Sequence, residues 1–174
     1  MATGRLISLS EENLVSCSYN GDMGCSGGEQ SSAFCWTYHT GGLCTEERYP
    51  YTSGGGKDGQ ECHQNCAPAV TVGGYHAIPA GDEDALLKAL QIGPVAIGLD
   101  ASSTAFALYK KGIINTPSCG NQIDHAVLLV GYGTGTEGTE KGVKYWKVKN
   151  SWNKDWGEVR ATTLAQFLIY KPLP

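Results

Sequence analysis

The second half of the chain, residues 76–157, consists of short apolar runs that alternate with polar turns. The runs VAIGLDA, HAVLLVGYG and VKYWKVKNSW have the length and apolar content of β-strands. The last two flank a loop rich in Gly, Thr and Glu over residues 134–142, which predicts an antiparallel pair. Successive strand side chains point to opposite faces, so Trp146, Val148 and Asn150 share the apolar face of the second strand. An asparagine on that face needs a hydrogen-bonding partner.

Helical signals precede and interrupt this strand region. In residues 1–75, Ser10 is placed to cap a helix over residues 11–15, and a second helix is expected over residues 30–39, where two glycines follow. The segment DEDALLKALQIGP predicts a third helix, because acids stand at its start and Gly-Pro at its end. The segment AFALYKKGII is expected to form a turn or short helix that leads into another strand.

Residues 158–174 contain one more apolar run, LAQFLIY. It fits a further strand, or else an unrelated tail that exposes Phe167 and Ile169. By pattern, residues 1–75 and residues 76–157 form two different parts of the chain.

Composition is typical of a globular chain. Of the 174 residues, 41% are hydrophobic and 17% are charged, and the formal net charge is −4. No basic cluster is present, so we expect no nucleic-acid partner. No apolar run reaches the ~18 residues of a membrane span, so we expect no membrane association.

The seven cysteines favour a secreted or lumenal disulfide framework over the alternative of reduced cytosolic thiols. Because the count is odd, at least one thiol has no partner within these residues. The first residues, MATGRLISLS, contain no apolar core of the kind that a signal peptide needs. A disulfide-type composition without an export signal suggests that the chain is an internal piece of a longer protein.

Several motifs occur in a specific order. QIDHA and KNSWNKDWG follow SLSEENLVSC, GCSGG, YPYT, GPVAIGLDA and FALYKKGI. Together they resemble the papain-like cysteine proteases over about residues 6–157. The resemblance implies an α+β fold of two lobes, incomplete in this chain. Residues 1–75 would form part of the helical, disulfide-rich left lobe, and residues 76–157 the antiparallel, barrel-like right lobe. Residues 158–174 form a divergent C-terminal tail.

The resemblance also implies a chemistry that needs no cofactor and no metal. In this family a cysteine thiolate attacks a peptide carbonyl, and a neighbouring histidine lowers the pKa of the thiol and later protonates the leaving amine. His125 matches the histidine, and Asn150 matches the asparagine that fixes its tautomer. Trp152 is expected to shield their hydrogen bond from water. A lone histidine or a lone asparagine at a strand end more often has a structural role. The catalytic interpretation depends on the two motifs occurring together in the order of the family.

Substrate-binding positions are implied in the same way. Gly27 and Gly28 are expected to let an extended peptide approach the backbone closely. The pocket for the side chain two residues before the cleaved bond is matched by Glu29, Gln30, Gly98 and Ile123. The pair Glu29-Gln30 is more polar than is common in the family, which leaves the side-chain preference open. Two tryptophans match the leaving-group side. The further substrate-binding positions are Glu29, Gln30, Gly98, Ile123, Asp124, Trp152 and Trp156.

A matching nucleophile is missing from these residues. The family motif Cys-Gly-[Ser/Ala]-Cys-[Trp/Tyr] lies ~130–150 residues before the histidine, which for His125 falls before Met1. Cys35 is followed by Trp36, as in the motif, but it lacks the preceding motif residues, lies too close to His125 and falls within a predicted helix. The family's oxyanion-hole glutamine precedes the nucleophile and is missing as well.

The resemblance pairs Cys17 with Cys62 or Cys66, and it leaves Cys25 and Cys119 without their family partners. Cys35 and Cys44 are additional cysteines that could form a further bridge, and spacing does not decide the connectivity. The alternative of a zinc site at Cys62-His63-x-x-Cys66 lacks a second pair of ligands.

The sequence therefore predicts a papain-like cysteine endopeptidase whose present chain lacks the catalytic cysteine and is inactive alone. Its partners are expected to be peptide or protein substrates and protein protease inhibitors, in a lysosomal, vacuolar or extracellular setting. The alternatives are a non-catalytic homologue that binds peptides or inhibitors, and a truncated gene-model product.

Overall fold

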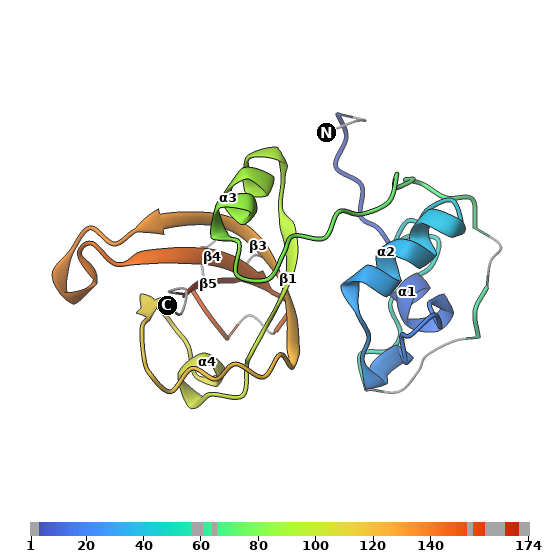
Figure 1. Ribbon diagram of the computed structural model, residues 1–174. Coiled ribbons are helices and arrows are strands. Elements are labelled where there is room, and N and C mark those ends of the chain that lie inside the picture. Colours follow the sequence, from blue (N-terminus) through green and yellow to red (C-terminus); the bar gives the residue numbers. More distant parts are fainter. Residues whose placement is uncertain (1–3, 57–60, 64–65, 153–154, 159–165, 171–174) are drawn as a thin grey trace. The chain divides into compact units, whose positions relative to one another are not determined.

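The structure is a computed structural model that describes residues 4–56, 61–63, 66–152, 155–158 and 166–170. The chain divides into two compact units, Met1–Ala77 and Ile78–Pro174, called unit 1 and unit 2 below (Figure 1). Among the described residues, no helix combines the length and the apolar character that crossing a membrane requires.

Unit 1 contains the helices α1 (Glu11–Cys17) and α2 (Gln30–His39), with the short 3-10 helix η1 (Gly24–Ser26) between them. The predicted cap of α1 is confirmed, because the Asn13 amide donates a hydrogen bond to the Ser10 hydroxyl oxygen over 3.0 Å. The helix is two residues longer than expected. The prediction of α2 is confirmed at both ends. An isolated bridge between Leu9 and Thr45 ties the start of unit 1 to the segment after α2, and a second between Leu43 and Val70 ties that segment to the end of the unit.

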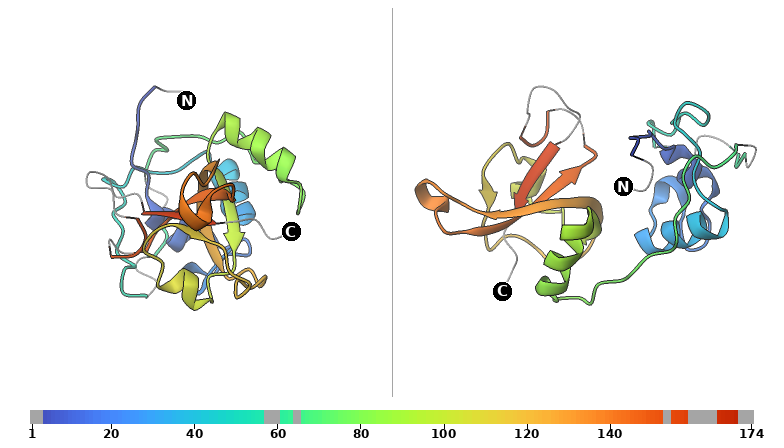
Figure 2. Two further views of the ribbon diagram at one scale, coloured as in Figure 1. Left: turned by 90° about the vertical axis from the view of Figure 1, so that its left-hand side faces the viewer. Right: turned by 90° about the horizontal axis from the view of Figure 1, so that it is seen from above.

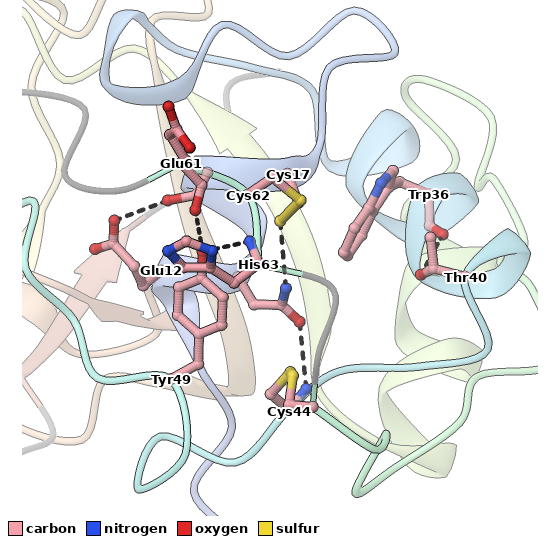
Figure 3. Close-up of a disulfide and its surroundings, with 12 residues drawn as sticks. Glu12, Cys17, Trp36, Thr40, Cys44, Tyr49, Glu61, Cys62 and His63 are labelled. Carbon is pink, nitrogen blue, oxygen red and sulfur yellow. Dashed lines mark hydrogen bonds between the residues drawn. A yellow bond between two sulfur atoms is a disulfide. The ribbon is translucent and has the colours of Figure 1, made fainter.

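Two disulfides cross-link unit 1, one from the end of α1 to a later loop and one between two loop segments. Cys17 at the end of α1 pairs with Cys62 (Figure 3), and Cys44 pairs with Cys66. The considered bridge between Cys35 and Cys44 is therefore wrong, since Cys44 has another partner and Cys35 keeps a free thiol. The zinc alternative is wrong as well, because both of its cysteines are oxidised in disulfides and offer no thiolate to a metal.

A carboxylate is among the most deeply buried groups of unit 1. Glu12 is fully buried, and its two oxygens accept hydrogen bonds from the Ser16 hydroxyl, the Ser53 hydroxyl and the amides of Thr52 and Ser53 over 2.8–3.0 Å. Burial acts to raise the pKa of the Glu12 carboxyl, but the hydrogen bonds from Thr52, Ser53 and Ser16 outweigh it and hold this pKa below its ordinary value. The ionised side chain thus fastens α1 to a loop about forty residues further on.

The described part of unit 2 contains a five-stranded sheet, two α-helices and a short 3-10 helix. In chain order its elements are α3 (Glu83–Ile92), β1 (Val95–Leu99), α4 (Thr104–Ala107), β2 (Ile113–Ile114), β3 (His125–Thr134), the 3-10 helix η2 (Gly138–Glu140), β4 (Lys144–Asn150) and β5 (Gln166–Tyr170). The strand order across the sheet is β1-β3-β4-β5-β2. The third helix, the strand pair β3–β4 and its turn are all as predicted, and that turn projects away from the rest of the sheet (Figures 1 and 2).

The pairing of the strands fixes which residues meet. β1 runs antiparallel to β3 with Leu99 opposite His125, and β3 runs antiparallel to β4 with a register shift between Leu129 and Gly131. β5 is antiparallel to β4 and parallel to the short β2. Of the two alternatives for the apolar run at the end of the chain, the structure therefore contains the strand. The side chains of Phe167 and Ile169 lie outside the described part of the molecule.

The apolar core of unit 2 lies between the sheet and the segment that contains α4. Leu129 and Val148 are almost completely inaccessible to solvent, and Leu86 and Leu90 of α3 pack against the same cluster. Burial of side chains of this size stabilises a fold by roughly 1.5–3 kcal/mol each, before conformational entropy is counted. The core cluster consists of Phe106, Tyr109, Ile114, Val127, Leu129, Val148 and Trp156.

Candidate active site

His125 is the first residue of β3 and Asn150 is the last residue of β4. Because the two strands are antiparallel neighbours, the start of one lies beside the end of the other. The His125 Nε2 and Asn150 Oδ1 atoms are 2.8 Å apart, a hydrogen-bonding distance. The structure thus brings together the two residues that the sequence proposed as a pair, and it buries Asn150 to 4% exposure, on the apolar face as predicted.

The hydrogen bonds around Asn150 assign the tautomer of the histidine. Asn150 Oδ1 also accepts the backbone amide of Ser151 over 2.8 Å, so this atom is the carbonyl oxygen and not the amide nitrogen. His125 Nε2 must therefore carry the proton that it shares with Asn150. Its Nδ1 atom is left as the nitrogen that can accept a proton from, or return it to, a reacting group. Among the described residues, the His125 ring makes this hydrogen bond only.

Aromatic rings surround the His125–Asn150 pair. The His125 ring centroid lies 5.1 Å from the Trp152 ring and 6.1 Å from the Phe106 ring, which approaches edge-on. Phe106 is 2% exposed, and its carbonyl accepts the indole Nε1–H of Trp156 over 2.8 Å. The rings limit how far the imidazole can rotate, and the low polarity strengthens its hydrogen bond to Asn150.

Phe106 is the part of this cluster that sequence reasoning missed. The segment AFALYKKGII was recognised as a turn or short helix before a strand, and the structure confirms it as α4 followed by β2. The available signal is the aromatic residue at the second position of that segment. Nothing in its local spacing shows that the ring packs against His125, which is 19 positions later in the chain.

A shallow pocket of about 490 Å³ lies next to Trp152 and Trp156 in unit 2. Its remaining walls come from α4 and the residues that follow it, and the Lys110 ammonium donates a hydrogen bond to the carbonyl of Asp155 at its rim. Both tryptophans that the sequence assigned to substrate binding therefore border an open cavity. The lining residues are Ala107, Leu108, Lys110, Trp152, Asp155 and Trp156.

A second group of expected binding residues lies where β1 and β3 pair. Ile123 is 70% exposed, and its Cγ2 atom would be only 2.6 Å from a Cβ atom placed on Gly98. Gly98 therefore keeps room for the isoleucine side chain above the strand. Asp124 accepts the Ala101 amide over 2.7 Å and donates its own amide to the Leu99 carbonyl. These bonds fix the backbone that leads into His125.

Asp100 fixes both the turn that follows β1 and the segment that leads to His125. Its carboxylate accepts the Ser102 hydroxyl over 2.6 Å and the amides of Ser102 and Gln122 over 3.0 Å each. The hydrogen bonds from Ser102 and Gln122 keep the pKa of the Asp100 carboxyl below its ordinary value. The segment from residue 119 to residue 124 is thus anchored by two carboxylates, Asp100 and Asp124.

The expected binding residues of unit 1 occur at the start of α2. Gly27 and Gly28 are exposed, Glu29 is the N-cap residue of α2, and Gln30 is its first residue. Gly27 has a φ of 113°, a backbone conformation that favours glycine. Three cysteines lie outside the disulfides: Cys25 is exposed, and Cys35, within α2, and Cys119 are partly buried.

Comparison with known proteins identifies the family of this arrangement. A family model described as papain family cysteine protease matches residues 1–165. Vignain from Ricinus communis is 44% identical over 156 residues, covering 90% of this chain and 41% of that protein. A cathepsin L-like peptidase from Aedes aegypti is 47% identical over 160 residues, covering 90% of this chain and 45% of that protein. The chain thus spans less than half the length of these curated relatives.

Solved structures agree with the sequence matches. The Amb a 11 cysteine protease, a ragweed pollen allergen in its proform, superposes with a TM-score of 0.83 at 34% identity, over 97% of this chain and 48% of that one. The bromelain protease from Ananas comosus, in complex with the E64 inhibitor, superposes with a TM-score of 0.81 at 32% identity, over 97% of this chain and 71% of that one. The expected α+β fold of this class is confirmed.

Proposed function

The chain belongs to the papain family of cysteine proteases, and from this premise we propose that it supplies the acid–base pair and part of the substrate cleft of an endopeptidase. The observation that carries the proposal is the 2.8 Å hydrogen bond between His125 Nε2 and Asn150 Oδ1, with the asparagine oxygen also held by the Ser151 amide. A histidine in this tautomer has Nδ1 available for proton transfer.

The proposed reaction is acyl transfer. A cysteine thiol gives its proton to His125 Nδ1, and the thiolate sulfur forms a bond to the peptide carbonyl carbon. The C–N bond breaks as the imidazolium returns the proton to the leaving amine, which leaves a thioester that water then hydrolyses. Asn150 stabilises the imidazolium through Nε2 and keeps the ring oriented, while the aromatic rings of Phe106 and Trp152 exclude water.

We propose that no thiol within residues 1–174 is the nucleophile. The motif that carries the family's cysteine is missing from the sequence, and Cys35 lies in the middle of α2 without the surrounding motif residues. The chain by itself is therefore expected to be inactive, and its endopeptidase activity depends on a cysteine supplied from outside these residues.

The proposed substrates are peptides or proteins bound in an extended conformation, and protein inhibitors of proteases would occupy the same positions. Gly27, Gly28, Glu29 and Gln30 would bind from unit 1, and Gly98, Ile123, Asp124, Trp152 and Trp156 from unit 2. The two disulfides support an oxidising compartment, which for this family we propose to be lysosomal, vacuolar or extracellular.

A second candidate function is peptide binding without cleavage. It is favoured by Gly28, whose amide and carbonyl make no hydrogen bond in the described part of the chain, so that both are available to a peptide main chain. Both candidates use the same binding residues, and they differ in whether a cysteine from outside these residues adds turnover.

The test combines a turnover assay with covalent labelling. The purified chain is incubated with a fluorogenic peptide and, separately, with the epoxide inhibitor E64, and the cysteines are then examined by mass spectrometry. We expect no hydrolysis and no E64 adduct on Cys25, Cys35 or Cys119. An adduct on Cys35, together with hydrolysis that disappears in Cys35→Ala, would show that the nucleophile lies within these residues and overturn this part of the proposal.

A further inference from the structure

Asp22 lies in the loop between α1 and η1, and its carboxylate is held from two sides. Its Oδ2 atom accepts the Ser18 hydroxyl over 2.5 Å, and its Oδ1 atom accepts the backbone amide of Glu29 over 2.8 Å. Ser18 is 1% exposed, so the first of these bonds ties the aspartate to the interior of unit 1. The second bond reaches the residue immediately after the Gly27-Gly28 pair.

The carboxylate of Asp22 also lies directly against Gly28. A Cβ atom placed on Gly28 would be 2.5 Å from Asp22 Oδ1, closer than real Cβ contacts allow. The absence of a side chain at Gly28 is therefore what lets the aspartate reach the Glu29 amide. Glycine is therefore needed at position 28 because of Asp22 within the chain. This reason is separate from the close approach of a peptide.

Gly27 and Gly28 differ in their hydrogen bonds, and therefore in their roles. The Gly27 carbonyl accepts the Met23 amide over 2.8 Å, and the Gly27 amide donates to the Gly24 carbonyl over 3.3 Å. The amide and carbonyl of Gly28 have no partner among the residues that the structure describes. Gly27 thus closes the loop, and Gly28 is left as an exposed peptide group with both of its polar atoms available.

We infer that Asp22 is a positioning residue, which holds Gly28 in the conformation that pairs with the main chain of an extended peptide. This inference rests on the proposed function, because it assumes that the Gly27-Gly28 segment binds peptide. Asp22 does not contact the peptide. It fixes the Glu29 amide on one side of Gly28, while the Met23–Gly27 bond fixes the other side. Without the carboxylate, a peptide would have to order this loop as it binds, and ordering costs affinity.

Substitutions at Asp22 separate its hydrogen bonds from its charge. Asp22→Ala removes both bonds. Asp22→Asn keeps the acceptor for the Glu29 amide, and its amide nitrogen can donate to the Ser18 hydroxyl oxygen instead. Asp82→Ala is the matched control, since Asp82 also accepts a backbone amide, that of Ala85 over 2.9 Å, at the start of α3 in unit 2. The control removes the same charge and one helix-capping hydrogen bond, but in unit 2 rather than in the loop that contains Gly28.

The experiment titrates the full 174-residue chain with a blocked tripeptide, acetyl-Phe-Leu-Arg-amide, by calorimetry and by ¹H–¹⁵N NMR. In the wild-type chain the Gly28 amide resonance should shift on saturation. We expect Asp22→Ala to raise the Kd about tenfold, as for the loss of two hydrogen bonds. Asp22→Asn and Asp82→Ala should bind within twofold of wild type.

The outcomes distinguish this inference from the proposed function. If the wild-type chain binds the tripeptide with no shift at Gly28, or does not bind it, the assigned cleft is wrong. If wild type binds with a Gly28 shift and Asp22→Ala binds equally well, the role of Asp22 is wrong. Should Asp22→Ala fail to fold by thermal unfolding, Ser18→Ala replaces it. That variant removes one of the two bonds and should weaken binding about threefold, and unchanged affinity would overturn the inference.

Discussion

Unit 1 and unit 2 each contain residues that the proposed function uses, but their interiors are made of different groups. Unit 2 encloses a continuous apolar cluster around Leu129 and Val148, on which the strands that present His125 and Asn150 lie. Unit 1 buries few apolar side chains, and two disulfides and a buried carboxylate cross-link it instead. Its buried polar residues are Ser10, Glu12, Asn13, Ser16, Ser18, Thr37 and Ser53.

The comparison teaches how each unit holds its functional groups. His125 and Asn150 need a fixed distance, and paired strands on an apolar core supply it. Gly28 needs a fixed backbone conformation, and we infer that it obtains this from the hydrogen bond between Asp22 and the neighbouring Glu29 amide, within the loop that the Cys17–Cys62 disulfide closes. The two units should therefore respond to different perturbations, which the following predictions use in order of decreasing effect.

Reduction of the disulfides should have the largest effect, and it should be confined to unit 1. Cys17–Cys62 and Cys44–Cys66 join residues 45 and 22 positions apart, and cross-links of this size stabilise by about 3–4 kcal/mol each in the chain-entropy model. We expect reductant to remove hydrogen-exchange protection from α1 and α2 while the amides of β3 and β4 stay protected. Equal loss of protection in both units would show that they do not have separate sources of stability.

Leu129→Ala should destabilise unit 2 by roughly 2–5 kcal/mol, because it leaves a cavity at a side chain with 0% exposure. Chemical denaturation followed by tryptophan fluorescence measures the change in a Trp36→Phe background, since the other tryptophans, Trp146, Trp152 and Trp156, lie in unit 2. Leu108→Ala is the control, since this leucine is 70% exposed and its loss should cost under about 0.5 kcal/mol. Similar losses for both variants would contradict the assignment of the core.

Acid should weaken unit 1 through Glu12. The pKa of this carboxyl in the folded chain lies below its ordinary value of 4.5, so the unfolded chain binds the proton more readily. The stabilisation is present in full above about pH 4.5 and is lost as the pH falls through the lower folded pKa. Glu12→Gln should cost roughly 1–3 kcal/mol near neutral pH, because a neutral amide replaces a charged acceptor, and it should flatten the acid side of the stability curve.

The measurement for Glu12 is thermal unfolding of unit 1 from pH 3 to pH 7, followed by the circular dichroism of the helices. The matched variant is Glu11→Gln, which changes an exposed acid in the same turn of α1. It should leave the pH dependence nearly unchanged. A wild-type curve as flat as that of Glu12→Gln would show that the buried carboxylate is not the source of acid sensitivity.

Local patterns predicted the regular elements well, because each depends on residues that are close in sequence. The cap at Ser10, the helix α2 and the hairpin of β3 and β4 are of this kind. Glu12 shows the opposite case. It lies in the first turn of α1, where carboxylates are favourable, but its main partners lie 40 and 41 positions away. No local pattern identifies such partners.

Pairing across long distances explains the other differences. The spacing of seven cysteines allowed several connectivities, and only the folded loops bring Cys44 to Cys66 rather than to Cys35. The run that became β5 was compatible with a strand, but its parallel pairing with β2 depends on how the sheet closes. At the candidate site, the motifs located His125 and Asn150, whereas Phe106 and Asp22 required the three-dimensional contacts.

The central claim is that Asn150 sets the tautomer of His125 and leaves Nδ1 available for proton transfer. Long-range ¹H–¹⁵N NMR of the neutral imidazole in wild type and in Asn150→Ala tests it directly, with the exposed His39 as an internal reference. We expect the His125 proton on Nε2 in wild type and a mixture of tautomers in the variant, with His39 unchanged. A wild-type His125 with its proton on Nδ1, or identical spectra for the two proteins, would contradict the claim.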